Sequence, residues 1–125
     1  MRTLVRGEII DFVPVFNAYL SDGVLIISED GDFSLTVDTG FSGGVALPEE
    51  TLGKMNVEFF GYDTFSLATG EVVELPMSLG IVILGGREIE TWFIPGDSLL
   101  GVEFLASAGS GLSLNFRNSV VKLTR

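Results

Sequence analysis

An Asp-Thr-Gly tripeptide, Asp38-Thr39-Gly40, is the segment whose residue types and spacing are best suited to chemistry. It follows an apolar strand pattern over Phe33–Val37 and leads into a glycine-rich loop at 41–44. A carboxylate at the end of a strand can accept or donate a proton. The plain alternative is structural, because Asp, Thr and Gly also make a good turn on their own.

The chain contains no histidine and no cysteine. This excludes Ser-His-Asp triads, cysteine nucleophiles, structural zinc sites, haem ligation, iron–sulfur clusters and disulfide scaffolds. Asp30 and Asp32 could suggest a Ca²⁺ loop, but the register of an EF-hand and its distal glutamate are missing, which favours a turn. We therefore expect no metal and no cofactor, and any catalysis must use carboxylates, hydroxyls, lysine or backbone groups.

Charge is distributed unevenly along the chain. Its 17 Asp and Glu residues against 7 Lys and Arg give a formal net charge of −10, and a surface of that sign repels nucleic acid and anionic lipid. We therefore expect neither a nucleic-acid partner nor a membrane partner. All acidic residues lie between Gly7 and Phe116, so a cleft built there should be acidic and suit a neutral or cationic ligand. Most basic residues lie near the chain ends: Arg2, Arg6, Arg117, Lys122 and Arg125.

The length of 125 residues predicts a single domain over residues 1–125, long enough for a core of its own and too short for two. No apolar run approaches the roughly 20 residues of a membrane span. The N-terminal region is interrupted by Glu8 and Asp11 before a signal-like apolar stretch develops. These features predict a soluble, cytoplasmic protein.

The elements that must position the tripeptide are predicted to be mostly strands. The 16 glycines and the short runs of Val, Ile, Leu and Phe are typical of an all-β chain with tight turns. Glu8–Leu20 has the alternation of one strand, with Pro14 at an edge or bulge position. A turn at 21–23 leads into a strand over 24–28, and 29–32 forms the next turn.

Two short helices and three hairpins complete the predicted domain. One helix begins at Pro48 and runs to about Met55, and the second covers Leu99–Ala108 with Asp97 as its cap. The predicted hairpins join Phe65–Leu67 to Val72–Leu75, Ile81–Leu84 to Glu88–Ile94, and Leu112–Phe116 to Val120–Leu123.

Three elements in this order resemble the retropepsin-like (clan AA) aspartic proteases, in particular the small prokaryotic members. The first is the apolar strand ending in Asp38-Thr39-Gly40, and the second is a hairpin with the tip Ala68-Thr69-Gly70, where the family has its flap. The third is Ser98-Leu99-Leu100-Gly101 followed by a helix. The resemblance covers residues 33–122, and Phe41 stands where viral members usually have alanine.

The resemblance implies a closed-barrel all-β fold with one or two short helices, and a homodimer in which each chain supplies one Asp38. Two carboxylates about 3 Å apart cannot both be ionised, so they share a proton; one then activates water while the other acts on the substrate carbonyl. No metal, cysteine or histidine is needed. The implied activity is that of an aspartic endopeptidase that hydrolyses peptide or protein substrates.

The resemblance also implies roles for single residues. Thr39 would hydrogen-bond across the two-fold axis, Gly40 would allow the tight turn, and the chain ends would form the intersubunit sheet. The implied catalytic residues are Asp38, Thr39 and Gly40, and the implied substrate-binding residues are Phe41, Ser42, Gly43, Ala68, Thr69, Gly70, Leu100 and Gly101.

An alternative from a different class is a non-catalytic domain of the same fold that binds peptides or mediates assembly. The tripeptide would then be retained as structure. A third possibility is a proteolytically inert dimer within a larger multiprotein system. A strictly monomeric protein would favour the binding domain, whereas an acid-shifted activity blocked by a pepstatin-like inhibitor would favour the enzyme.

Overall fold

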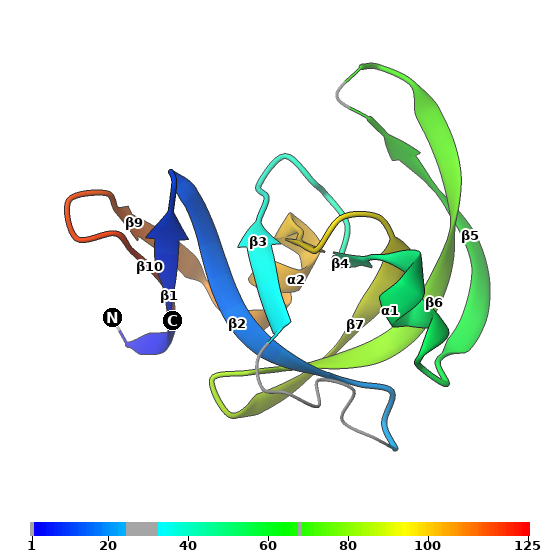
Figure 1. Ribbon diagram of the computed structural model, residues 1–125, viewed down its shortest axis with the longest axis horizontal. Helices are drawn as coiled ribbons and strands as arrows, with labels where there is room; N and C mark the ends of the chain where they lie inside the picture. Colours follow the sequence, from blue (N-terminus) through cyan, green and yellow to red (C-terminus); the bar gives the residue numbers. More distant parts are fainter. Residues whose placement is uncertain (1, 25–32, 68) are drawn as a thin grey trace.

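The computed structural model describes residues 2–24, 33–67 and 69–125, and these form mostly strands, as predicted (Figure 1). The predicted strand over 24–28 lies almost wholly outside the described residues. The same holds for the turn at 29–32, with Asp30 and Asp32, and for Ala68. The strands are β1 Thr3–Ile10, β2 Val13–Ser21, β3 Phe33–Val37, β4 Val45–Leu47, β5 Glu58–Ser66, β6 Val72–Leu84, β7 Arg87–Pro95, β8 Leu99–Leu100, β9 Gly111–Asn115 and β10 Val120–Thr124; the helices are α1 Glu49–Gly53 and α2 Val102–Ala108.

The strands form one ten-stranded sheet in the order β5-β6-β7-β4-β8-β3-β2-β1-β10-β9. An additional pairing of β6 with β2 closes β2, β3, β8, β4, β7 and β6 into a ring of neighbours. Strands β1, β10 and β9 extend the sheet outside this ring, so β5 and β9 remain its two edges. A closed barrel made by the whole chain therefore stays a prediction.

The predicted single strand over Glu8–Leu20 is wrong, because the chain reverses at Asp11 and Phe12. These two residues have positive φ angles of 50° and 67°, and Ile10 pairs with Val13 across the turn. Such a two-residue turn needs the left-handed region at both positions, for which Asn-Gly or Asp-Gly is the usual sequence. Asp-Phe lacks that signal, and the alternation of apolar residues continues through the turn.

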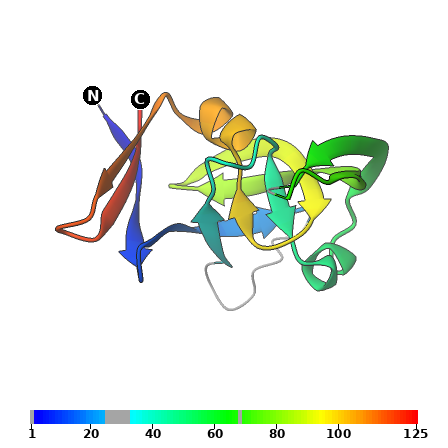
Figure 2. The same ribbon diagram turned by 90° about the horizontal axis from the view of Figure 1, so that it is seen from above.

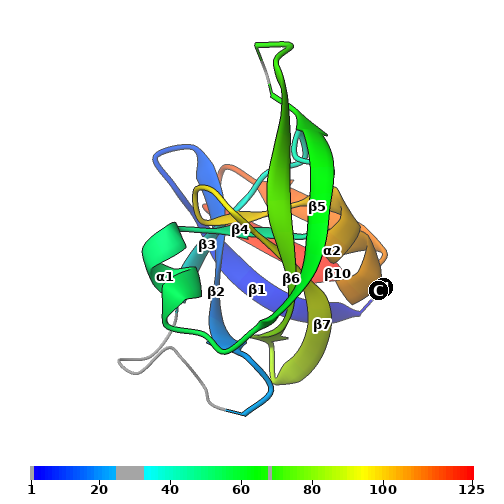
Figure 3. The same ribbon diagram turned by 90° about the vertical axis from the view of Figure 1, so that its right-hand side faces the viewer.

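The three predicted hairpins are present, and the strands of two of them are longer than their sequence patterns. The β5–β6 and β6–β7 hairpins share β6, which runs for 13 residues. The turn between β6 and β7 uses Gly85 and Gly86, both at positive φ, as a tight hairpin turn requires. Figure 3 shows the β5–β6 hairpin extending beyond the rest of the molecule.

The first helix lies close to its predicted position, whereas the second begins later than predicted. Leu99 and Leu100 form β8, which pairs in parallel with β3 and antiparallel with β4. Helix α2 starts after Gly101, its N-cap, and no side chain caps it, so the predicted capping role of Asp97 is wrong. The spacing of the apolar pair at 99–100 fits a helix, but the backbone groups of both residues pair with β3 on one side and with β4 on the other.

The core lies inside the ring of strands and beneath α2. Its largest fully buried side chains include Phe16, Phe93 and Phe104, and Phe104 belongs to the buried face of α2 together with Leu105 and Ala108. Helix α2 therefore anchors to the same core as the strands that precede the Asp-Thr-Gly tripeptide. Neither described helix is long and apolar enough to cross a membrane.

The two chain ends lie side by side, at the end of the molecule that also holds the β9–β10 hairpin (Figure 2). Arg2 and Arg125 exchange two backbone hydrogen bonds of 3.1 and 2.8 Å, and β1 pairs with β10 along its length. Because β10 has β1 on one side and β9 on the other, the terminal strand has no free edge. The chain ends thus pair within one chain, and the free edge at this end of the sheet belongs to β9.

Candidate active site

Asp38 follows β3 directly and lies at the end of the parallel pair of β3 and β8. Its backbone N–H donates to the carbonyl of Leu100 at 3.0 Å, which continues the ladder by one residue. The carboxylate Oδ1 accepts a hydrogen bond from the N–H of Gly40 at 2.9 Å, and the N–H of Phe41 donates to the Asp38 carbonyl at 3.2 Å. The half-buried Asp38 side chain is therefore held by its own turn.

The loop after the tripeptide is attached to the start of α2 by three backbone hydrogen bonds. The N–H groups of Gly101, Val102 and Glu103 donate to the carbonyls of Gly44, Phe41 and Gly43, at 2.7, 2.8 and 3.2 Å. A Cβ at Gly101 would collide with the backbone of Gly43, so only glycine allows this close approach. This arrangement fixes Asp38 from both sides, through its own strand and through α2.

The β5–β6 hairpin contacts this loop through Phe65. The rings of Phe65 and Phe41 lie with their centroids 6.1 Å apart and their planes tilted by 47°. A Cβ at Gly43 would lie within about 3 Å of both rings, so this glycine makes room for the aromatic pair. The residue type of Phe65 does not by itself indicate this contact. Its position three residues before Ala68, the first residue of the predicted flap tip, is the feature from which the contact could have been predicted.

The structure brings most of the predicted site residues together around this loop. Asp38, Thr39 and Gly40 lead into it, and Phe41, Ser42 and Gly43 belong to it. The carbonyl of Leu100 accepts from the N–H of Asp38, and the N–H of Gly101 donates to Gly44 in the loop. Thr69 and Gly70 form the exposed tip of the hairpin, where Gly70 has a φ of +87°. Within the described part of the chain, the hairpin meets the loop at Phe65 near the end of β5, and Thr69 and Gly70 lie beyond this contact, toward the tip.

An open, mainly apolar hollow of about 480 Å³ adjoins the tripeptide. Thr39 forms part of its wall, together with α2 and the start of β9. Both Val102 of α2 and Leu112 of β9 contribute to it, and Val102 is 43% exposed. The hollow therefore connects the candidate catalytic loop with the free edge of the sheet, a link that the sequence did not predict.

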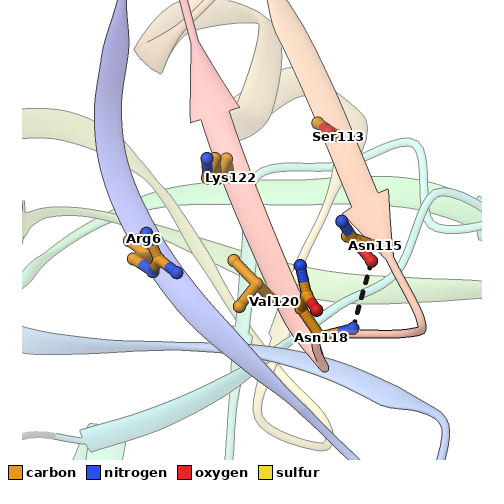
Figure 4. A pocket seen from close by; sticks show the side chains of 6 residues that line it. All are labelled: Arg6, Ser113, Asn115, Asn118, Val120 and Lys122. Carbon is orange, nitrogen blue, oxygen red and sulfur yellow. Dashed lines mark hydrogen bonds between the residues drawn. The ribbon is translucent and has the colours of Figure 1, made fainter.

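Basic residues gather on the β1–β10–β9 part of the sheet. Arg6 and Lys122 are direct cross-strand partners, so two like charges face each other. They line a small polar cavity of about 80 Å³ with Ser113, Asn115, Asn118 and Val120 (Figure 4). Across residues 2–24, 33–67 and 69–125, no group of three acidic side chains is placed to hold a metal ion.

The comparisons with known proteins bear on the fold. No family model matches the sequence, and no curated protein matches it. Among solved structures, the chain is similar to the EIAV protease complexed with the inhibitor HBY-793, with a TM-score of 0.63. The fold is retropepsin-like. The sequences are 17% identical, and the match covers 84% of this chain and 96% of the EIAV protease chain.

Proposed function

We propose that the protein is an aspartic endopeptidase that acts as a homodimer. The observation that carries the proposal is the placement of Asp38: it ends a strand, its loop is bonded to α2, and a hairpin contacts that loop through Phe65. The retropepsin-like fold agrees with this use of the Asp-Thr-Gly tripeptide. One chain supplies one such carboxylate, so a second copy completes the dyad.

In the proposed reaction the two Asp38 carboxylates share one proton. The ionised carboxylate removes a proton from a water molecule, which attacks the peptide carbonyl, while the protonated carboxyl donates to the carbonyl oxygen. The hydrogen bond from Gly40 to Asp38 Oδ1 orients one oxygen of each carboxylate. Thr39 stiffens the loop at the two-fold axis.

The proposed partner surface is the hollow beside Thr39 together with the free edge of β9. A two-fold dimer uses the same patch on both copies, and two antiparallel β9 strands related by a two-fold axis can pair along their free edges. In the wall of the hollow, the exposed Val102 and the half-buried Leu112 offer apolar surface to bury. Because Thr39 belongs to the same wall, this contact brings the two tripeptides toward each other.

The substrate in this proposal is an extended peptide held between the catalytic loop and the β5–β6 hairpin. Backbone hydrogen bonds would hold it as an added strand, with side-chain pockets giving preference. The residues proposed to contact it are Phe41, Ser42, Gly43, Ala68, Thr69 and Gly70. Leu100 and Gly101 were predicted as contacts as well, but both are buried, so they would support the loop and not touch the peptide.

The test is the variant Asp38→Asn, assayed for hydrolysis of an unfolded protein such as casein over a range of acidic pH with and without pepstatin. We expect the variant to lose cleavage and to keep its fold by circular dichroism, because asparagine is close in size and cannot accept the proton. Asp97→Asn, at an exposed bend before β8, is the matched control and should retain activity. Undiminished hydrolysis by the Asp38→Asn protein would end the proposal.

The second candidate is a non-catalytic peptide-binding domain in which the Asp-Thr-Gly tripeptide serves as structure. The hydrogen bond from the N–H of Gly40 to Asp38 Oδ1 favours it, because it gives the carboxylate a role within its own turn. Peptide binding of equal strength by the wild type and Asp38→Asn, with no cleavage by either, would support this function.

A further inference from the structure

The β5–β6 hairpin has two faces of different character. We call the face that carries Phe65 the inner face, because the ring of Phe65 contacts Phe41 in the loop that follows the Asp-Thr-Gly tripeptide. This loop, residues 41–44, is the catalytic loop of the proposed function. Side chains on paired strands alternate between faces, so the partner of Phe65, Val73, lies on the inner face as well. The next inner pair is Asp63 with Leu75. Phe65, Val73 and Leu75 are half-buried, as expected of an apolar strip that faces the floor of the site.

Two carboxylates lie at the ends of this inner strip. Asp63 belongs to it on the side of the hairpin base, where its Oδ1 accepts a hydrogen bond from the N–H of Thr64 at 2.8 Å. Glu71 belongs to it at the tip, because its carbonyl accepts from the N–H of Leu67 and continues the ladder beyond the pair of Ser66 and Val72. The inner face is therefore apolar in the middle and negative at both ends.

The outer face of the hairpin carries a third carboxylate, Glu74, in the same stretch of the two strands as Asp63 and Glu71. Glu74 pairs with Thr64, one position along from Phe65 and Val73, so it points away from the catalytic loop. Both residues of this pair are exposed. The sequence of the hairpin, residues 58–84, contains no lysine and no arginine to neutralise these acidic groups.

We propose that the hairpin selects peptides with Lys or Arg on either side of an apolar centre. The apolar strip would cover the apolar residues of the bound peptide, while Asp63 and Glu71 attract the flanking cations. This inference rests on the proposed function, since it assumes that the peptide lies between the hairpin and the loop. A peptide flanked by acidic residues would meet like charges on both sides and bind more weakly.

The test uses two peptides with the same apolar centre, flanked by Lys in one and by Glu in the other. The measured quantity is the ratio of their kcat/KM values, in which any general loss of activity cancels. We expect the wild type to favour the Lys-flanked peptide. Glu71→Gln and Asp63→Asn should each lower the ratio about two- to fivefold, the range for one exposed ion pair, and Glu74→Gln should leave it unchanged.

Salt gives a second readout of the same preference. The ratio should fall toward one in about 0.5 M salt, where the Debye length is only a few ångströms. A wild-type ratio of one at low salt would overturn the inference, as would an equal change in all three variants. If neither peptide is cleaved, the proposed function fails; the same peptides and variants are then compared by calorimetric binding, and equal affinities for the two peptides would overturn the inference separately.

Discussion

The two edges of the ten-stranded sheet lie at opposite ends of the molecule, and they are protected to different degrees (Figure 1). The β5 edge carries Glu58 and Asp63, and its register is interrupted between Phe59 and Gly61, where Gly61 has a φ of +109°. Charges and bulges of this kind prevent an edge strand from pairing with another chain. The β9 edge has the uncharged sequence of Gly111–Asn115 and a regular register.

This difference agrees with the different partners that we propose for the two ends of the sheet. The β5 side is acidic and irregular, which suits a short cationic peptide that is bound and released. The β9 side adjoins the apolar hollow at Thr39, which suits a lasting contact with a second copy. The two ends of the sheet also differ in charge. Residues 58–84 contain no lysine or arginine, whereas Arg6 and Lys122 lie on the β1–β10–β9 part of the sheet.

The largest expected effect comes from placing a charge in the hollow. Val102→Glu should raise the dissociation constant of the proposed dimer about 100-fold or more, because an unpaired charge in the proposed interface would cost several kcal/mol. Glutamate suits the first turn of α2, so the monomer should stay folded. The measurement is sedimentation velocity over a range of concentrations, with peptide cleavage measured in parallel.

The matched control for this variant lies in the hairpin at the other end of the sheet. Val72→Glu changes an exposed valine on the outer face of the β5–β6 hairpin and should leave the dimer intact. Dissociation by Val72→Glu but not by Val102→Glu would reverse the roles of the two edges. A wild type that is monomeric at all concentrations would remove the proposed dimer.

The next effect concerns the link between α2 and the loop that follows the Asp-Thr-Gly tripeptide. Gly101→Ala should destabilise the protein by about 2 to 3 kcal/mol, because its Cβ would collide with the backbone of Gly43. Gly53→Ala, where a Cβ meets nothing, should be neutral or slightly stabilising. Urea unfolding measures both variants, and equal stabilities would contradict the close contact.

A smaller effect is expected for the contact between the hairpin and the loop. Phe65→Ala removes the partner of Phe41 and should loosen the β5–β6 hairpin by about 1 kcal/mol, the contribution of an aromatic pair. Hydrogen exchange of the β5 amides should become faster near position 65. In Phe59→Ala, which loses a contact with Tyr62 within the hairpin, exchange at position 65 should stay as in the wild type.

The smallest effect tests the basic side of the molecule. Lys122→Glu replaces a pair of facing like charges by an attractive pair with Arg6 and should stabilise the protein by about 0.5 kcal/mol. Thermal unfolding at low salt should show the gain, and high salt should remove most of it. A loss of stability at low salt would mean that the cation at position 122 has a favourable contact of another kind.

Much of the fold could be predicted because local patterns and tertiary contacts agree. The alternation over Phe33–Val37, the glycine pair at 85–86 and the proline before α1 each point to the element that forms. The predictions were wrong where strand pairing determines the local structure. Asp11 and Phe12 form a turn although their residue types are not typical of one. Leu99 and Leu100 fit a helical pattern but form a strand, because they pair with β3 and β4.

The candidate site was predictable only in part for the same reason. The tripeptide and the segment at Leu100 and Gly101 are visible as motifs, and the structure connects them through hydrogen bonds from Asp38 to Leu100 and from Gly101 to Gly44. The Phe41–Phe65 contact and the hollow at Thr39 depend on how a hairpin and a helix pack across the loop. No local pattern encodes these distances between segments far apart in the sequence.

The packing of Trp92 has a practical consequence. It is the only tryptophan in the sequence, and its ring lies against that of Phe60 on β5, with centroids 5.3 Å apart and planes at 76°. Since Trp92 belongs to β7 and Phe60 to the base of the hairpin, a movement of β5 changes the surroundings of the indole. We therefore expect the intrinsic tryptophan fluorescence to report a movement of the hairpin without any added label.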